Sequence, residues 1–183
     1  MVSLNLIPHL KPDRIIDLEI HGGGLSDINR LGGSLEVLHT KSQKELEKWF
    51  DDDDQLILVD TGGFDLTLNR YALSQADFIL SPTSDDPTDQ LRLKDFNRTM
   101  KEVSKSVGEH LTAYALLNRV HPNRRSFDDF DELISGLDHV ERLPNIIPQS
   151  VSLPKAAFKG QPIKSGSIAA NFAKLAKDIK MKL

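Results

Sequence analysis

Residues 56–63 read LILVDTGG, and they are the most informative stretch of the chain. Four apolar residues run directly into Asp60, as is typical of a strand buried on both faces of a parallel sheet. A carboxylate at the end of such a strand lies where ligands bind in open α/β sheets, and the glycines after it allow backbone N–H groups to approach an anion. Two interpretations stay open. Either Asp60 holds magnesium through water while Thr61, Gly62 and Gly63 contact a nucleotide phosphate, or the segment is a strand-to-helix turn with a capping aspartate.

The composition narrows the class of protein. The chain has 183 residues, a hydrophobic fraction of 39% and a net charge of −4, which suits one domain with an apolar core and indicates no general affinity for nucleic acid. The absence of cysteine excludes disulfides, thiolate zinc sites and cysteine nucleophiles. No apolar run approaches the roughly 20 residues that span a bilayer, and the first residues lack the basic start of a signal peptide. We therefore expect a soluble, cytoplasmic α/β protein.

Apolar patterns of strand and helix type alternate along the chain. Strands are predicted near residues 14–20, 35–39, 55–60, 76–80, 111–117 and 140–147. Helices are predicted near residues 2–10, 42–50, 65–75 and 88–108, after Ser126, and at the C-terminus. Ser42 and Glu45 have the spacing of a capping box. This alternation implies right-handed crossovers, and hence a mostly parallel sheet flanked by helices on both faces, in a single domain over residues 1–183.

Several fragments occur in a specific order. The fragment IIDLEI carries Asp17 and Glu19, and LILVDTGG, ADFILSPTS, LLNRVHPNRR and IIPQSVSLPKAAFKGQPI follow it. This series resembles the ParA/MinD family of deviant P-loop ATPases, which partition plasmids and chromosomes or place the division site. The resemblance covers nearly the whole chain. It implies a P-loop NTPase-like fold, use of ATP and Mg²⁺, homodimerisation, a ParB-like activating partner and a cytoplasmic, nucleoid-associated location.

The resemblance also implies an acidic catalytic set. Asp60 matches the magnesium-side aspartate of the family, and Asp17 and Glu19 match its D-x-D pair. Asp17 and Asp60 would then be the metal residues, and the set would position magnesium and the attacking water, which is most of what phosphoryl transfer needs. An alternative for Asp17 is a capping carboxylate. Glu19 stands where the family has aspartate, which moves the carboxylate outward by about one C–C bond and favours slow or altered hydrolysis.

The resemblance also implies a second group of site residues, which would bind the nucleotide base. Asn118, with Arg119 beside it, falls where the family reads the adenine edge, and Pro148 falls where it lines the base. Structural alternatives stay open here too, with Asn118 as a turn cap and Pro148 as a strand terminator. We expect Asp17, Asp60, Asn118 and Pro148 to lie at the carboxyl edge of the sheet.

The largest departure from the family is an absence. The phosphate loop K-G-G-x-G-K-[ST] does not occur in the chain, although MVSLNLIPHL resembles the helix that follows this loop. We expect either an N-terminally shortened partition ATPase or a non-catalytic binding or scaffold protein of the same fold. Without the strand that carries the loop, the strands at 55–60 and 76–80 would have unpaired edges.

The C-terminal helix is amphipathic and basic. Its apolar stripe is Ile168, Phe172, Leu175 and Ile179. Its lysines include Lys174, Lys177 and Lys180. We interpret the stripe first as core packing. The lysines are then a solvated face or a site for non-specific DNA binding, and a membrane partner is the least favoured reading.

Overall fold

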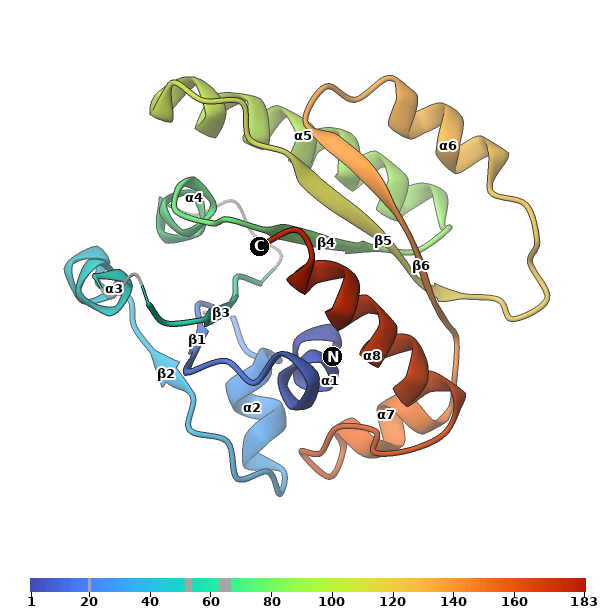
Figure 1. The fold of residues 1–183 in the computed structure, drawn as a ribbon, viewed down its shortest axis with the longest axis horizontal. Helices are drawn as coiled ribbons and strands as arrows, with labels where there is room; N and C mark the ends of the chain where they lie inside the picture. The colour runs from blue at the N-terminus through green and yellow to red at the C-terminus, as the bar shows by residue number, and fades with distance from the viewer. Residues whose placement is uncertain (20, 52–53, 63–66) are drawn as a thin grey trace. The chain divides into compact units, whose positions relative to one another are not determined.

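The computed structural model describes residues 1–19, 21–51, 54–62 and 67–183 (Figure 1). The chain divides into two compact units: unit 1 comprises Met1–Ala72 and Val151–Ala176, and unit 2 comprises Leu73–Ser150 and Lys177–Leu183. Each unit has its own three-stranded sheet, and every strand pair in the two sheets is parallel. The predicted parallel α/β fold is confirmed, although the strands of the described residues form two sheets rather than one. The expectation of a single domain stays a prediction.

Unit 1 contains three strands and the helices that pack on them. Its elements are α1 (Val2–Leu10), β1 (Arg14–Asp17), α2 (Leu25–Arg30), β2 (Leu38–His39), α3 (Gln43–Phe50), β3 (Ile57–Asp60), most of α4 (Thr67–Ser74), α7 (Ser152–Ala157) and most of α8 (Ser167–Lys180). The strand order is β2-β1-β3.

Alternation along β1 explains why helices cover both faces of the unit 1 sheet. Ile15 is buried in a cluster with Leu4 of α1 and Leu25 of α2. The next residue, Ile16, is buried in a different cluster with Leu46 of α3. Successive side chains of a strand point to opposite faces, so the two isoleucines hold helices on opposite sides.

Unit 2 is built around β5. Its elements are β4 (Ile79–Thr83), α5 (Pro87–Val107), β5 (Ala113–Val120), α6 (Asp128–Ser135), β6 (Val140–Pro148) and the end of α8. The strand order is β4-β5-β6, and Leu117 of the central strand is fully buried with Phe130 of α6 and Leu93 of α5. The last residues of the chain join this unit, because Asn145 Nδ2 donates to Asp178 Oδ2 at 2.8 Å and the Lys182 ammonium lies 4.3 Å from the Tyr114 ring centroid.

Three local details differ from the sequence predictions. The Ser42 side chain does not cap α3; instead, the Thr40 hydroxyl contacts the Glu45 carboxylate and accepts from the Ser42 N–H at 2.9 Å. Strand β5 continues to Val120 and β6 to Pro148, so residues expected after the strands lie within them. Two six-residue helices, α2 and α7, were not predicted, because helices this short show too little of the 3.6-residue period.

The strands at 55–60 and 76–80 correspond to β3 and β4. Each is an edge strand of its own sheet, and no strand in the described ranges pairs with its outer side. Pro82 lies within β4, a position that suits an edge because proline donates no hydrogen bond to a neighbour. Strand β3 is only half-buried along its whole length, despite its apolar sequence.

Within the part of the chain that the structure describes, no helix is both long enough and apolar enough to cross a membrane.

Candidate functional site

The acidic edge of unit 1 is made by the ends of β1 and β3. The two strands pair in parallel, and their register sets Asp17 directly beside Asp60. Both residues are the last of their strands, so both lie at the carboxyl edge. This confirms the predicted placement of the two carboxylates.

The Asp17 carboxylate accepts hydrogen bonds from backbone N–H groups. Its side chain is buried, with the residue 2% exposed. Its Oδ1 accepts from the Glu19 N–H at 3.0 Å, and its Oδ2 accepts from the Ser26 N–H, in the first turn of α2, at 2.7 Å. A Cβ at Gly24 would lie 2.7 Å from Asp17 Oδ2, so only glycine allows this approach. The capping alternative for Asp17 is therefore what the structure shows, and it leaves one lone pair on each oxygen for another ligand.

Asp60 faces the start of α1. Burial raises the pKa of the Asp60 carboxyl above its usual range; the positive N-terminal ammonium of Met1 opposes this, and the negative charge of Asp17 adds to it. Hydrogen bonds from Ser3 and from the backbone of Leu25 also favour the charged form. The N-termini of α1 and α2 thus converge on one carboxylate, a contact the sequence analysis did not foresee for Ser3.

Glu19 lies against the turn that follows β3. Its Oε1 accepts from the His21 N–H at 2.7 Å. Gly62 has φ +64°, and a Cβ there would lie 2.2 Å from Glu19 Oε2. Thr61 Oγ1 has a 3.5 Å contact with the Gly62 carbonyl oxygen, and Gly63 lies outside the described residues. Glycine at position 62 thus serves both the left-handed turn and the close approach of the Glu19 carboxylate.

The acidic edge can be tested as a magnesium site from its donor set. Magnesium is commonly held by one or two carboxylates together with waters and substrate phosphates, and Asp17 and Asp60 fit that pattern. Among the described residues, no three His, Asp or Glu side chains are grouped as a metal site of their own. The arrangement therefore suits an ion that arrives with a phosphate ligand.

The predicted base-binding residues lie together in unit 2. In the pairing of β5 with β6, Asn118 is opposite Ile147 and Val120 is opposite Pro148, with a bulge between Asn118 and Val120. Arg119 occupies the bulge with φ 60°. A left-handed conformation is uncommon for a residue other than glycine, and it often marks a functional site.

The guanidinium of Arg119 has an acidic neighbour on α5. Arg119 Nη2 lies 3.6 Å from Asp89 Oδ2. A hydrogen bond from Ser84 lowers the pKa of the Asp89 carboxyl, and the positive charge of Arg119 lowers it further. Ser84 and Asp89 could not be recognised as a pair from sequence pattern, because their contact joins a loop to a helix five residues later.

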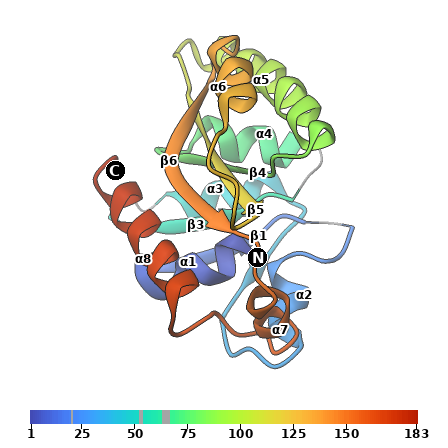
Figure 2. The same ribbon diagram turned by 90° about the vertical axis from the view of Figure 1, so that its right-hand side faces the viewer.

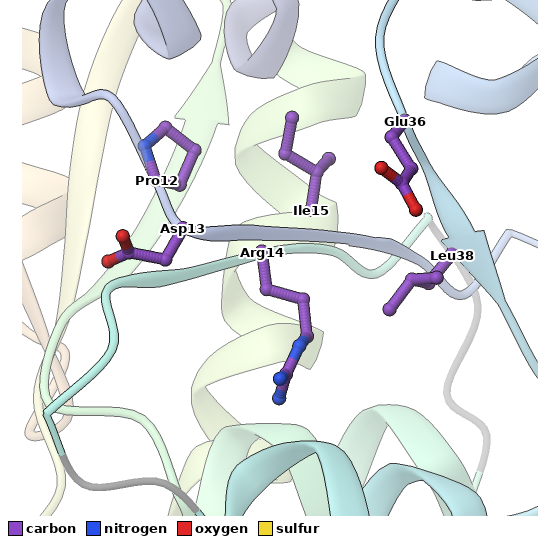
Figure 3. Close-up of a pocket in the computed structure, with 6 residues that line it drawn as sticks. All are labelled: Pro12, Asp13, Arg14, Ile15, Glu36 and Leu38. Carbon is purple, nitrogen blue, oxygen red and sulfur yellow. The ribbon is translucent and has the colours of Figure 1, made fainter.

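A pocket of about 280 Å³ lies elsewhere in unit 1 (Figure 3). It surrounds the amino end of β1 and is lined by Pro12, Asp13, Arg14, Ile15, Glu36 and Leu38. Figure 3 shows Arg14 and Ile15 on opposite sides of the strand, and the Arg14 guanidinium donates to the Trp49 carbonyl. The pocket contains no predicted site residue and lies at the opposite end of the strand from Asp17.

The C-terminal helix has the predicted division between its faces. Its apolar stripe is buried at Ile168, Phe172, Leu175 and Ile179. Lys174, Lys177 and Lys180 are exposed. Core packing of the stripe is thus confirmed.

Among known proteins, the similarity that was found is one of fold. The sequence matches no protein-family profile and no curated protein. The structure is similar to the crystal structure of a ParA family ATPase from Chlorobium tepidum TLS, with a TM-score of 0.63 and 16% sequence identity over 96% of this chain and 92% of that chain. The chain therefore has a P-loop NTPase-like α/β fold, and the low identity extends the likeness no further than the fold.

Replacing Asp17 by alanine should destabilise the protein. The change leaves the Glu19 and Ser26 N–H groups without their acceptors, which should lower the free energy of unfolding by about 2 kcal/mol. Asp17→Asn keeps one acceptor oxygen and should cost less. Urea denaturation measures both, with Asp77→Ala, an exposed loop aspartate, as the control. Equal midpoints for Asp17→Ala and the control would contradict the capping role.

Asp60→Asn should stabilise the protein at neutral pH. Because the folded state raises the pKa of Asp60, the group favours folding below its unfolded value of 3.8, and this contribution is lost as pH rises through the folded pKa. The asparagine variant should therefore have a higher thermal midpoint than the parent at pH 7. The difference should disappear near pH 3.5. Circular dichroism melts at several pH values measure this, with Asp77→Asn as the matched control; a pH-independent difference would contradict it.

Proposed function

We propose that this chain is a ParA-like partition protein and that Mg²⁺–ATP binds at the acidic edge of unit 1. The observation that carries the proposal is the start of α1 at Asp60, where the Ser3 side chain donates a hydrogen bond to the carboxylate. A helix N-terminus favours phosphate, because its first N–H groups have no partner within the helix. A phosphate placed there would lie beside a carboxylate able to hold its magnesium ion.

Each predicted residue has a place in this proposal. Bound Mg²⁺ would neutralise phosphate charge, and Asp60 would hold it through water with Asp17 beside it. Glu19 would orient the attacking water. Asn118, Arg119 and Pro148 would contact the base. ATP-dependent homodimerisation, activation by a ParB-like partner and a cytoplasmic, nucleoid-associated location belong to the same proposal.

A second candidate is a non-catalytic binding or scaffold protein of this fold. The observation that favours it is the commitment of both Asp17 oxygens to backbone N–H groups. The chain also contains no K-G-G-x-G-K-[ST] loop whose lysines would balance the phosphates. On this reading the acidic edge holds α1 and α2 in place and never meets a nucleotide.

Calorimetric titration with ATP and MgCl₂ separates the two candidates. The 183-residue chain should bind ATP poorly. A variant carrying a strand and a K-G-G-x-G-K-T loop ahead of Met1 should bind with micromolar-class affinity that requires magnesium, because the loop supplies the missing cations and N–H groups. The control replaces both loop lysines by alanine. Failure of the loop-bearing variant to bind would favour the scaffold, whereas tight binding by the chain alone would contradict the need for the loop.

The exposed lysines of α8 predict weak, sequence-independent DNA binding. Retention of duplex DNA should appear at low salt and fall with a log–log slope of about −0.9 per phosphate neutralised. Replacing Lys174, Lys177 and Lys180 by glutamate should abolish it without unfolding the protein, because the apolar stripe is untouched. The matched control replaces three exposed lysines of α5, Lys94, Lys101 and Lys105, by glutamate. Equal retention by both triple variants would leave α8 as a packing element only.

A further inference from the structure

The end of α2 and the helix α7, both in unit 1, expose large apolar side chains. Val151 and Phe158 are each 76% exposed and Leu31 is 56% exposed. Lys155 and Lys159 are exposed beside them. We call these five residues the α2–α7 surface.

Helical spacing places three of the five residues on one face. Val151 and Phe158 flank α7 with right-handed helical backbone angles, so residues 151–158 form one continuous helical run. Positions i, i+4 and i+7 of a helix lie on the same side, which aligns Val151, Lys155 and Phe158. The opposite side of α7 packs on the protein core through Leu153 and Ala157, which are buried. The exposed apolar face is therefore not the face by which α7 packs on its own unit.

A tight backbone contact brings α2 to the end of α7. A Cβ at Gly33 would lie 2.6 Å from the Gly160 carbonyl oxygen, and one at Gly32 would lie 3.1 Å from that of Lys159. Leu31 immediately precedes these glycines, and both helices lie in the lower part of the view in Figures 1 and 2. The loop after α2 is also held, because the Asn29 side-chain amide donates to the Leu35 carbonyl at 2.8 Å and accepts from its N–H at 3.1 Å. The surface is thus preformed.

The α7 side of this surface carries only positive charge. Residues 151–166 contain three lysines and no aspartate or glutamate, in a protein of net charge −4. On α2, Asp27 is paired with Arg30, whose Nη1 lies 2.6 Å from Asp27 Oδ1. An apolar centre bordered by cations is complementary to a partner with apolar anchors bordered by carboxylates. Three apolar side chains beside two lysines are too few to anchor a protein stably on a bilayer, whereas one aromatic and two aliphatic anchors are enough for the centre of a protein interface.

We propose that the α2–α7 surface binds an acidic amphipathic segment of a partner protein. Phe158 is the central anchor, Val151 and Leu31 extend the apolar contact, and Lys155 and Lys159 pair with carboxylates of the partner. The five residues include none of the α8 lysines and no residue of the acidic edge, so the proposed binding needs no nucleotide.

Fluorescence anisotropy with the full chain tests this proposal. The probe is a labelled synthetic helical peptide. It has Leu and Phe at positions i, i+3, i+4 and i+7, and Glu at all the remaining positions. The same peptide with Lys in place of Glu is the comparison. The Glu peptide should bind, and the Lys peptide should not. Phe158→Ala should weaken binding about tenfold, and Lys155→Glu with Lys159→Glu should reverse the preference between the peptides.

Matched controls come from α5. Leu91, which is 61% exposed, is replaced by alanine, and the exposed Lys101 and Lys105 are replaced by glutamate. These variants should bind the Glu peptide as the parent does. Absence of peptide binding, or equal losses in the α7 and α5 variants, would overturn the proposal. Two other results would also overturn it: binding to phosphatidylglycerol vesicles, or self-association in sedimentation velocity. In either case the result counts if Phe158→Ala abolishes it while peptide binding is unchanged.

Discussion

The parallel pairing of β1 with β3 is the constraint on which unit 1 depends. Its register sets Asp17 beside Asp60, and two neighbouring carboxylates in a partly buried place repel one another and lose hydration. The surrounding structure offsets this cost in two ways. Asp17 accepts from the backbone at the start of α2, and Asp60 faces the positive N-terminus of α1. The first turns of both helices thus face this pair of carboxylates, while the apolar cluster around Ile15 packs the same helices on the sheet.

The two carboxylates are left in different chemical states. Asp17 has a hydrogen-bonded partner on each oxygen, whereas burial raises the pKa of Asp60. A cation near Asp60 would relieve the cost of its charge, and magnesium or a loop lysine could equally supply that cation. This is why the same edge suits a nucleotide site when a phosphate loop is present and a purely structural role when it is not.

Two of the edge strands in the described residues, β3 and β4, differ in how their outer edges are protected. Strand β4 carries Pro82, which discourages further strand pairing. Strand β3 is Ile57–Asp60, with no proline and no charge before Asp60, and it is half-buried. Of these two strands, β3 has the more apolar sequence and the less protected edge. The α2–α7 surface is different in kind, because there side chains rather than backbone groups are exposed.

Local patterns were enough to predict the order and type of the longer elements, the parallel pairing and the place of Asp60. The patterns are a four-residue apolar run before a carboxylate, and helical periodicity in α5 and α8. The division of the described strands into two sheets could not be predicted in this way, because strand pairing joins residues that are distant in the sequence. Only the tertiary structure decided that α2 and α7 exist, since six-residue helices depend on contacts such as Asp17 with Ser26 and Gly33 with Gly160. The role of Asp17 was decided in the same way, because a capping carboxylate and a metal ligand look alike until the partner N–H groups are in place.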